Sequence, residues 1–161
     1  MKGISEMTVR RAEKKDAERI LDLLTQVLTI HANLFPDVFI PGTTKYSAED
    51  LGAMFGDDEA PVYVAADDDD SVIGHMFCEV RERKGENMFP SKALYVDDLC
   101  IDAAHRGEGV GAALFKHAKR EAARLGCDRI TLTVWKGNTA AELFYEKMGM
   151  KPIETFMELK F

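Results

Sequence analysis

The segment Arg106–Ala112 combines a positive charge with three glycines directly ahead of a strongly predicted helix. It reads Arg106, Gly107, Glu108, Gly109, Val110, Gly111 and Ala112. A helix N-terminus leaves backbone N–H groups unpaired and carries a partial positive charge. Glycines let a ligand approach those N–H groups without a Cβ in the way. The chemistry expected of this segment is therefore the binding of a phosphate or pyrophosphate group.

Two phosphate-binding patterns fit these residues. Read from Gly107, the spacing matches the dinucleotide pattern G-x-G-x-x-G/A, whereas read from Arg106 it matches a turn that binds coenzyme A. A dinucleotide site places its first glycine at the end of the first strand, but here Ala103–Arg106 intervene and the segment lies two-thirds along the chain. Asp128, the acid about 20 residues further on, precedes a strand instead of ending one. An NAD(P) oxidoreductase therefore remains only as an alternative.

The elements around this segment predict a single α+β domain over residues 8–161, preceded by a flexible tail over residues 1–7. Helical periodicity is expected from residue 17 to about residue 30 and over 48–55, 110–125 and 139–148. Strands are expected over 8–11, 61–66, 71–83, 93–102 and 130–135, with one or two more in 151–161. Hairpins followed by a β-α-β crossover imply a mixed sheet with helices on both faces.

Composition and charge limit the function classes. The 161 residues are 46% hydrophobic and 30% charged, which is typical of a globular domain. The net charge of −7 equals the seven acids of two clusters, Asp57–Glu59 and Asp67–Asp70, so the rest of the chain has no basic surface for nucleic acid. Cys78, Cys100 and Cys127 are odd in number and lack C-x-x-C spacing, which predicts reduced thiols in the cytoplasm and no zinc site. No apolar run approaches the roughly 20 residues of a membrane span.

A second block, Asn138–Tyr145, follows the glycine segment at a fixed distance. The stretch LYVDDLCIDAAHRGEGVGAAL followed by N-x-x-A-x-x-F-Y-E-K-M-G-M resembles the GCN5-related N-acetyltransferase (GNAT) superfamily. The resemblance covers about Tyr95–Gly149, and the predicted order of elements fits the whole chain. It implies a mostly antiparallel sheet of six or seven strands that splays between strands 4 and 5.

The same resemblance implies how acetyl-CoA binds. The backbone amides of the segment from Gly107 to Ala112 (Gly107, Glu108, Gly109, Val110, Gly111 and Ala112) would hold the pyrophosphate, and Arg106 would add positive charge. The splayed strand, with Leu99, Cys100 and Ile101, would pair with the pantetheine arm. The N–H at or near Ile101 would then stabilise the developing oxyanion. Asn138 suits the N-cap of its helix and, by resemblance, also contacts the pantetheine or substrate region.

Tyr145 and Asp97 are the two residues expected to move protons. Tyr145 stands where the family commonly has a tyrosine that protonates the departing coenzyme A thiolate. Asp97 takes the place of a glutamate base, but its side chain is one methylene shorter, so a water relay is an equal alternative. Strand alternation would point Asp97 and Asp98 to opposite faces, leaving Asp98 as a structural acid. His31, His75 and Glu79 are other candidates, for which structural or solvated roles are expected.

The sequence therefore predicts an acetyl-CoA-dependent N-acetyltransferase in which a primary amine attacks the thioester directly, with no metal. The acceptor is expected to be a small cationic amine, polyamine-like or aminoglycoside-like, in a pocket shaped by loop 33–46 with Phe35, Phe39 and Tyr46. A protein N-terminal or lysine acetyltransferase of the same fold and a non-catalytic acetyl-CoA sensor remain alternatives. No nucleic-acid or membrane partner is expected, and a homodimer is left open.

Overall fold

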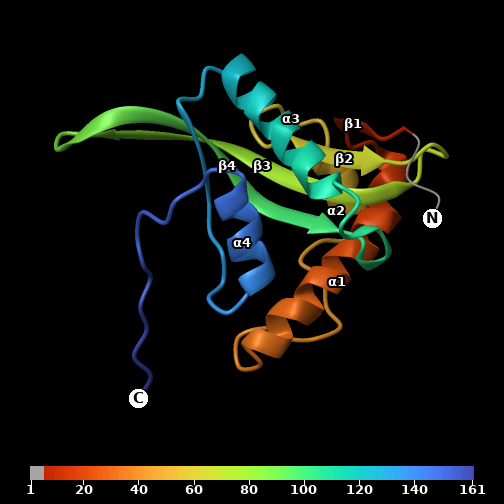
Figure 1. Ribbon diagram of the computed structural model, residues 1–161, viewed down its shortest axis with the longest axis horizontal. Coiled ribbons are helices and arrows are strands. Elements are labelled where there is room, and N and C mark those ends of the chain that lie inside the picture. Colours follow the sequence, from red (N-terminus) through yellow and green to blue (C-terminus); the bar gives the residue numbers. More distant parts are fainter. Residues whose placement is uncertain (1–5) are drawn as a thin grey trace.

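The structure is a computed structural model that describes residues 6–161 (Figure 1). Within these residues there are five strands: β1 (Thr8–Arg11), β2 (Val62–Ala66), β3 (Val72–Gly85), β4 (Met88–Ile101) and β5 (Arg129–Leu132). The four α-helices are α1 (Ala17–Leu34), α2 (Ala48–Met54), α3 (Val110–Arg124) and α4 (Thr139–Lys147). Short 3-10 turns, η1 (Lys14–Asp16) and η2 (Ala103–His105), precede α1 and follow β4.

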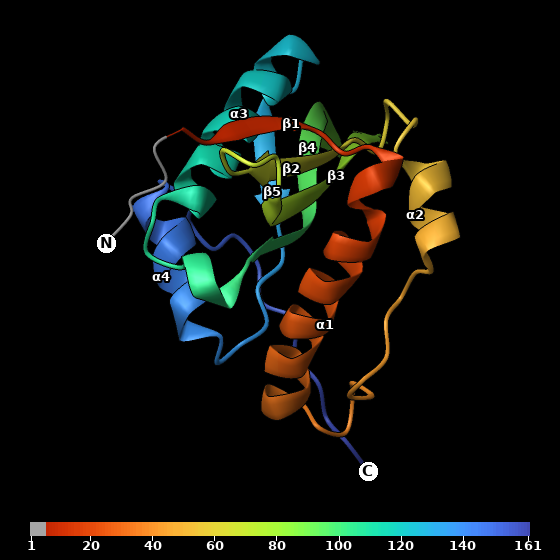
Figure 2. The same cartoon turned by 90° about the vertical axis from the view of Figure 1, so that its right-hand side faces the viewer.

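The five strands form one open sheet in the order β1-β2-β3-β4-β5. All neighbouring pairs are antiparallel except β4 and β5, which are parallel. Helices α1 and α2 cover one face and α3 and α4 lie on the other (Figure 2). The prediction of a mixed, mostly antiparallel sheet with helices on both faces is confirmed.

Each face of the sheet has its own apolar core. The α1 face buries side chains from α1, α2, β2 and β4, among them Ile20, Leu23, Leu51, Val64 and Cys100. The other face buries Met76, Leu94 and Val96 against α3. Helix α3 buries Val110, Leu114, Phe115, Ala118 and Ala122, a stripe at helical spacing. The predicted apolar side of this helix is confirmed.

The β3–β4 hairpin is longer than predicted. Residues 84–92 are expected to be a loop, but β3 reaches Gly85 and β4 starts at Met88. The sequence there is polar, and the strand residues beyond Val80 and before Ser91 are exposed. Backbone pairing between two strands does not require an apolar face, so periodicity gave no signal for this extension.

Strands β4 and β5 pair only over part of their length. Their register runs from Ala93 opposite Arg129 to Val96 opposite Leu132, whereas β4 continues to Ile101. Among residues 6–161, the last residues of β4 therefore have no strand partner on the β5 side, and the predicted splay is confirmed. This unpaired stretch beside β4 is called the gap below.

The two ends of the chain differ from the prediction. Residues 1–5 of the predicted tail lie outside the described residues, and Met7 packs partly buried against the α3-side core. Lys151–Phe161, which the structure describes throughout, forms neither helix nor strand and extends away from the body (Figure 1). The prediction of a sixth or seventh strand there is wrong for this chain alone. None of the helices within residues 6–161 is long and apolar enough to cross a membrane.

Candidate active site

The glycine loop between η2 and α3 is open at Gly107 and Gly109, where an added Cβ would meet no other atom within 4 Å. Gly107 and Gly109 have φ angles of 79° and 84°, a left-handed conformation that side chains disfavour. Gly109 is the N-cap of α3 and has no side chain with which to satisfy the first N–H groups of the helix. Arg106 is exposed, and no hydrogen bond or ion pair joins it to another of the described residues. The loop therefore has the conformation and the free donors that an anion needs.

Two further glycines bring this loop close to its neighbours. A Cβ on Gly111 would lie 3.1 Å from the ring of Phe144 in α4. A Cβ on Gly74 in β3 would lie 3.0 Å from Val110. The start of α3 is thereby seated against both the sheet and the helix that carries Tyr145.

Side chains of α1 bind the residues that lead from β4 into the glycine loop. Arg19 forms an ion pair with Asp102, at the end of β4, and donates to the Val72 carbonyl at 3.0 Å. The Gln26 amide donates to Asp102 at 3.2 Å and accepts from the N–H of Ala103 at 3.1 Å. Burial acts to raise the pKa of Asp102, but the bonds from Gln26 and Ala104 and the Arg19 charge outweigh it and lower the pKa. Sequence reasoning missed these positioning residues because their contacts span more than 50 positions along the chain.

The free edge of β4 carries the N–H groups expected to face pantetheine. The N–H of Asp102 donates to the Ile73 carbonyl of β3 at 2.9 Å. Because N–H direction alternates along a strand, the N–H groups of Leu99 and Ile101 point the other way, into the gap beside β5. The Cys100 thiol instead contacts the Leu23 carbonyl at 3.3 Å in the core, where burial raises its pKa to about 12. Its side chain is therefore part of the α1-side core.

A β-bulge lies where the two aspartates stand. Phe77 pairs with Asp98 and Cys78 pairs with Val96, so Asp97 is the extra residue in β4. Val96 and Leu99 both belong to the α3-side core, three positions apart, which shows that the bulge shifts the alternation by one residue. The simple expectation that Asp97 and Asp98 alternate between faces is therefore wrong. Asp97 is exposed, whereas the side chain of Asp98 is only 18% exposed.

Asp98 is held by a fully buried histidine. The Nε2 atom of His75 lies 2.6 Å from a carboxylate oxygen of Asp98, and the ring packs edge-on against Phe77. The Nδ1 atom of His75 is buried and has no hydrogen-bond partner among the described residues. A neutral ring that donates from Nε2 leaves only a lone pair unsatisfied, so this tautomer fits the surroundings best. The carboxylate of Asp98 is then fixed as a hydrogen-bond acceptor.

The Tyr145 phenol interacts electrostatically with the Asp98 carboxylate. Burial raises the pKa of Tyr145 above its ordinary value, and the negative charge of Asp98 raises it further. The ring packs against Phe115 and Phe144 at centroid distances of 6.2 and 5.1 Å. The phenol therefore stays protonated at neutral pH, as a proton donor must. Asp98 also acts on His31, but burial is the larger influence and lowers the pKa of that imidazole.

An aromatic cluster joins the end of α1 and loop 33–46 to the segment that follows β5. Trp135, just after β5, packs against Phe35 at 4.9 Å and Phe39 at 5.0 Å, and His31 stacks beside Phe39 at 5.2 Å. Tyr46 stacks on Phe77 at 6.0 Å. The aromatic residues of loop 33–46 therefore contact the sheet and the segment just after β5. Their part in shaping an acceptor pocket stays a prediction. Trp135 was missed, since a lone tryptophan at a strand end carries no spacing signal.

The remaining candidates have structural partners. Asn138 is the N-cap of α4 and accepts from the Ala141 N–H at 3.4 Å. Glu79 is exposed and pairs with Arg81 on its own strand. No group of three or more His, Cys, Asp or Glu within residues 6–161 is arranged to hold a metal ion.

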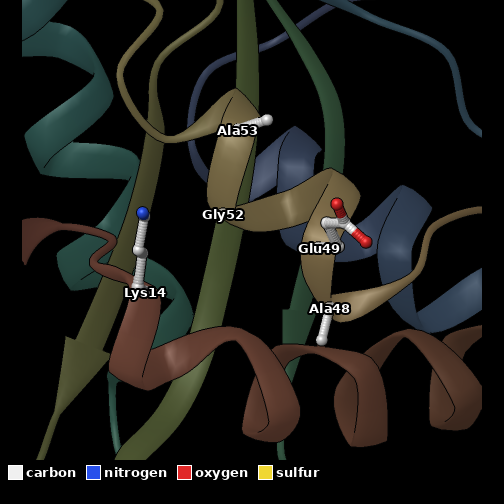
Figure 3. Close-up of a pocket in the computed structure, with 5 residues that line it drawn as sticks. All are labelled: Lys14, Ala48, Glu49, Gly52 and Ala53. Atoms are coloured by element: carbon white, nitrogen blue, oxygen red, sulfur yellow. The ribbon is translucent and has the colours of Figure 1, made fainter.

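A surface hollow elsewhere on the molecule is unrelated to these residues. It lies between η1 and α2 and is lined by Lys14, Ala48, Glu49, Gly52 and Ala53 (Figure 3). Its lining includes none of the predicted site residues and holds only one acid and one base. We assign it no part in the chemistry.

Comparison with known proteins agrees with this geometry. Residues 24–150 match the profile of the Acetyltransferase (GNAT) family. The chain is 30% identical to a peptidyl-lysine N-acetyltransferase, YjaB, of Salmonella typhimurium, over 90% of this chain and 83% of that protein. A mutant of the BH1408 protein from Bacillus halodurans has a TM-score of 0.91 at 26% identity, covering 96% of this chain and 99% of that one.

A more distant structure shares the fold alone. Aminoglycoside N-acetyltransferase AAC(6')-Iy, solved in complex with CoA, has a TM-score of 0.71 at 16% identity, covering 97% of this chain and 95% of that one. The chain belongs to the Acetyltransferase (GNAT) family. It is an acyl-transferring enzyme of the N-acetyltransferase class.

Proposed function

We propose that this enzyme transfers an acetyl group from acetyl-CoA to the primary amine of a small, cationic acceptor. The observation that carries the proposal is the meeting, at one gap in the sheet, of the glycine loop, the free β4 edge, Asp98 and Tyr145. The first two supply N–H donors for the pyrophosphate and pantetheine, and the last two supply a proton acceptor and a proton donor. Arg106 and the amides from Gly107 to Ala112 are assigned to the pyrophosphate.

The transfer would form a bond from the amine nitrogen to the acetyl carbon and break the bond from that carbon to sulfur. The N–H of Ile101 would stabilise the negative charge that develops on the carbonyl oxygen. The amine would lose its proton to a carboxylate, and the Tyr145 phenol would protonate the departing thiolate. Asp97 remains a candidate acceptor through a water molecule, but Asp98 is the carboxylate oriented by His75 and electrostatically close to Tyr145.

Charge supports a cationic acceptor. Asp97 and Asp98 both act on the ammonium of Lys45, whose pKa is raised first by Tyr46 and then by these acids. The Lys45 ammonium lies 5.2 Å from the centre of the Tyr46 ring. Two carboxylates beside an aromatic face are groups that attract an ammonium ion. A lysine ε-amine of a protein is the second candidate, favoured by the relative named as a peptidyl-lysine N-acetyltransferase.

Free thiol released from acetyl-CoA tests this proposal. The enzyme would be incubated with acetyl-CoA and, in separate reactions, spermidine, an aminoglycoside and a lysine-containing peptide. Saturable thiol release with spermidine or the aminoglycoside, and less with the peptide, is the expected result. Thiol release with the peptide alone would identify protein lysines, and not small amines, as the acceptor. Acetyl-CoA binding without release by any acceptor would favour the sensor.

A further inference from the structure

Lys45 is a primary amine that the fold brings towards the carboxylates of the β4 bulge. It lies in the connection between α1 and α2 and is exposed (Figure 2). Its ammonium is 5.2 Å from the centre of the Tyr46 ring, and that ring stacks on Phe77 at 6.0 Å with 7° between the planes. Phe77 is the β3 residue opposite Asp98 in β4. This stack leads from an amine on loop 33–46 to the carboxylate that is proposed to accept a proton.

Both aspartates of the bulge act on this amine. The pKa of Lys45 is raised first by its interaction with the Tyr46 side chain, and the charges of Asp97 and Asp98 raise it further, although burial opposes them. Asp98 also raises the pKa of Tyr145, after burial. Asp98 is therefore within electrostatic reach of both an amine and a protonated phenol. An ammonium must lose a proton before it can attack a carbonyl carbon, and a nearby carboxylate can accept that proton.

No ion pair holds the Lys45 ammonium in place. Among residues 6–161 no carboxylate lies within ion-pair distance of it, whereas four other lysines are paired, namely Lys15 with Asp70, Lys84 with Glu82, Lys136 with Glu142 and Lys160 with Asp37. The nearby Asp50 carboxylate instead accepts hydrogen bonds from the N–H and the hydroxyl of Ser47, both at 2.8 Å. A lysine side chain has a flexible four-carbon stem. The amine can therefore move along the Tyr46 ring towards the gap without breaking an ion pair.

We propose that Lys45 is a self-acetylation site, at which its Nζ atom takes the acetyl group from acetyl-CoA bound in the gap of the same chain. This inference rests on the proposed function, since it uses the same donor and the same proton-transferring groups. A bond forms from Lys45 Nζ to the acetyl carbon, and the bond from that carbon to sulfur breaks. One ammonium proton passes to Asp98, and the Tyr145 phenol protonates the departing thiolate. The second nitrogen proton, lost as the amide forms, restores the phenol.

Mass spectrometry of the enzyme with acetyl-CoA and no added amine tests the proposal. The acetyl group would carry deuterium, so that transfer in the reaction is distinguished from acetyl groups already present. We expect label on the peptide that contains Lys45, approaching one group per chain. Lys14 is the matched reference, because it is also exposed and without an ion pair among residues 6–161 but lies at the hollow between η1 and α2. Label on Lys45 at no higher rate than on Lys14 would mean chemical acetylation alone and overturns the proposal.

Two variants separate enzymatic transfer from chemical acetylation. Lys45→Arg keeps the positive charge but lacks the amine, and it should reduce the label on the intact chain to background. Tyr145→Phe retains Lys45 and should lower its labelling rate about 100-fold, the lower range of general acid catalysis, with label on Lys14 unchanged. Unlabelled acetyl already on Lys45 in the purified protein, and absent from Tyr145→Phe, would support the proposal in the same way. Labelling of Lys45 at the unaltered rate in Tyr145→Phe overturns it.

Dilution shows whether the transfer stays within one chain. At saturating acetyl-CoA, the fraction of Lys45 labelled per unit time should not change when the protein is diluted. A rate that falls with dilution would mean transfer between chains and overturns the proposal. Thiol release with spermidine, an aminoglycoside and a lysine-containing peptide is measured in parallel. Release with one of these amines but no label on Lys45 overturns self-acetylation alone, whereas neither release nor label refutes the proposed function as well.

Discussion

The proposed coenzyme end and the proposed acceptor end of the gap between β4 and β5 are built in different ways. At the proposed coenzyme end, the loop from Arg106 to Ala112 is one continuous segment, and the role proposed for it belongs mainly to its backbone. At the acceptor end, Asp98, His75, Tyr145 and Trp135 come from four separate parts of the chain and act through side chains. A binding site made of consecutive backbone groups can be recognised from a short sequence motif. A site made of side chains from distant segments depends on which elements the fold brings together.

Tyr145→Phe tests proton donation separately from the binding of coenzyme and acceptor, and it should have the largest effect on turnover. The phenol proton is lost while the ring packing against Phe115 and Phe144 is retained. We expect kcat to fall about 100-fold or more, with acetyl-CoA affinity unchanged, because general acid catalysis contributes about 10²–10⁴-fold. Steady-state kinetics and calorimetry measure the two quantities. Tyr95→Phe, at a half-buried position of β4 that pairs with Thr131 of β5, is the control, and equal turnover in both variants would refute the role of Tyr145.

Asp98→Asn and Asp97→Asn form a matched pair that probes the acceptor end. If Asp98 accepts the proton, its replacement should lower kcat/KM for the amine by about 100-fold, toward the lower range of acid–base catalysis. Asp97, exposed on the bulge, should lose about threefold, as expected of a surface charge that attracts a cation. The reverse order of effects would restore Asp97, with its water relay, as the base.

Arg106→Ala probes the coenzyme end. The side chain lacks an intramolecular partner among the described residues, so its loss should leave the folded protein intact. A charge-assisted contact to phosphate is worth about 1.5–3 kcal/mol, and we expect KM for acetyl-CoA to rise about tenfold or more while kcat stays the same. The control is Arg120→Ala, on the exposed side of α3. A fall in kcat with unchanged KM would place Arg106 nearer the chemistry.

Gly111→Ala tests whether the two ends are mechanically joined. Its Cβ would meet the Phe144 ring at 3.1 Å, so α4 or the ring must move by a few tenths of an ångström. We expect a several-fold loss in both kcat and acetyl-CoA affinity, since both Tyr145 and the loop shift. Gly52→Ala in α2 is the control, because its Cβ would meet only the flexible Lys14 side chain, at 3.6 Å. Normal kinetics for Gly111→Ala would mean that the ends act independently.

The smallest effect concerns pH and stability. Burial lowers the pKa of His31 and of His117, so both prefer the neutral form in the folded state. Below the ordinary histidine pKa of about 6.5, the unfolded chain binds protons that the folded chain resists, and stability is lost as the pH falls through that value. We expect the unfolding midpoint to drop between about pH 7.5 and 5.5, and His31→Gln with His117→Gln to reduce that drop. A drop of the same size in the double variant would contradict the prediction.

The local backbone structure of the proposed coenzyme end was largely predictable from the sequence. Glycines, an arginine and the start of an apolar helical stripe each have a local meaning, and the structure gives Gly107 and Gly109 the left-handed conformations that the motif requires. Asn138 as a helix cap and the stripe on α3 were predicted for the same local reason. The alternating residues of Lys151–Phe161 also gave a strand signal, although no strand forms within one chain.

The acceptor end was decided by the tertiary structure. The bulge at Asp97 shifts the alternation of every later side chain of β4 by one position. No residue type in this stretch of sequence indicates that a bulge will form. His75 meets Asp98 only because β3 and β4 pair in that register, and Arg19 and Gln26 reach Asp102 only because α1 crosses the sheet. The local sequence determines the backbone conformation and which backbone N–H groups are free to donate, because both depend on residues that are neighbours in the chain. Which carboxylate faces the gap depends on the register and packing of segments far apart in the sequence, and only the folded chain sets these.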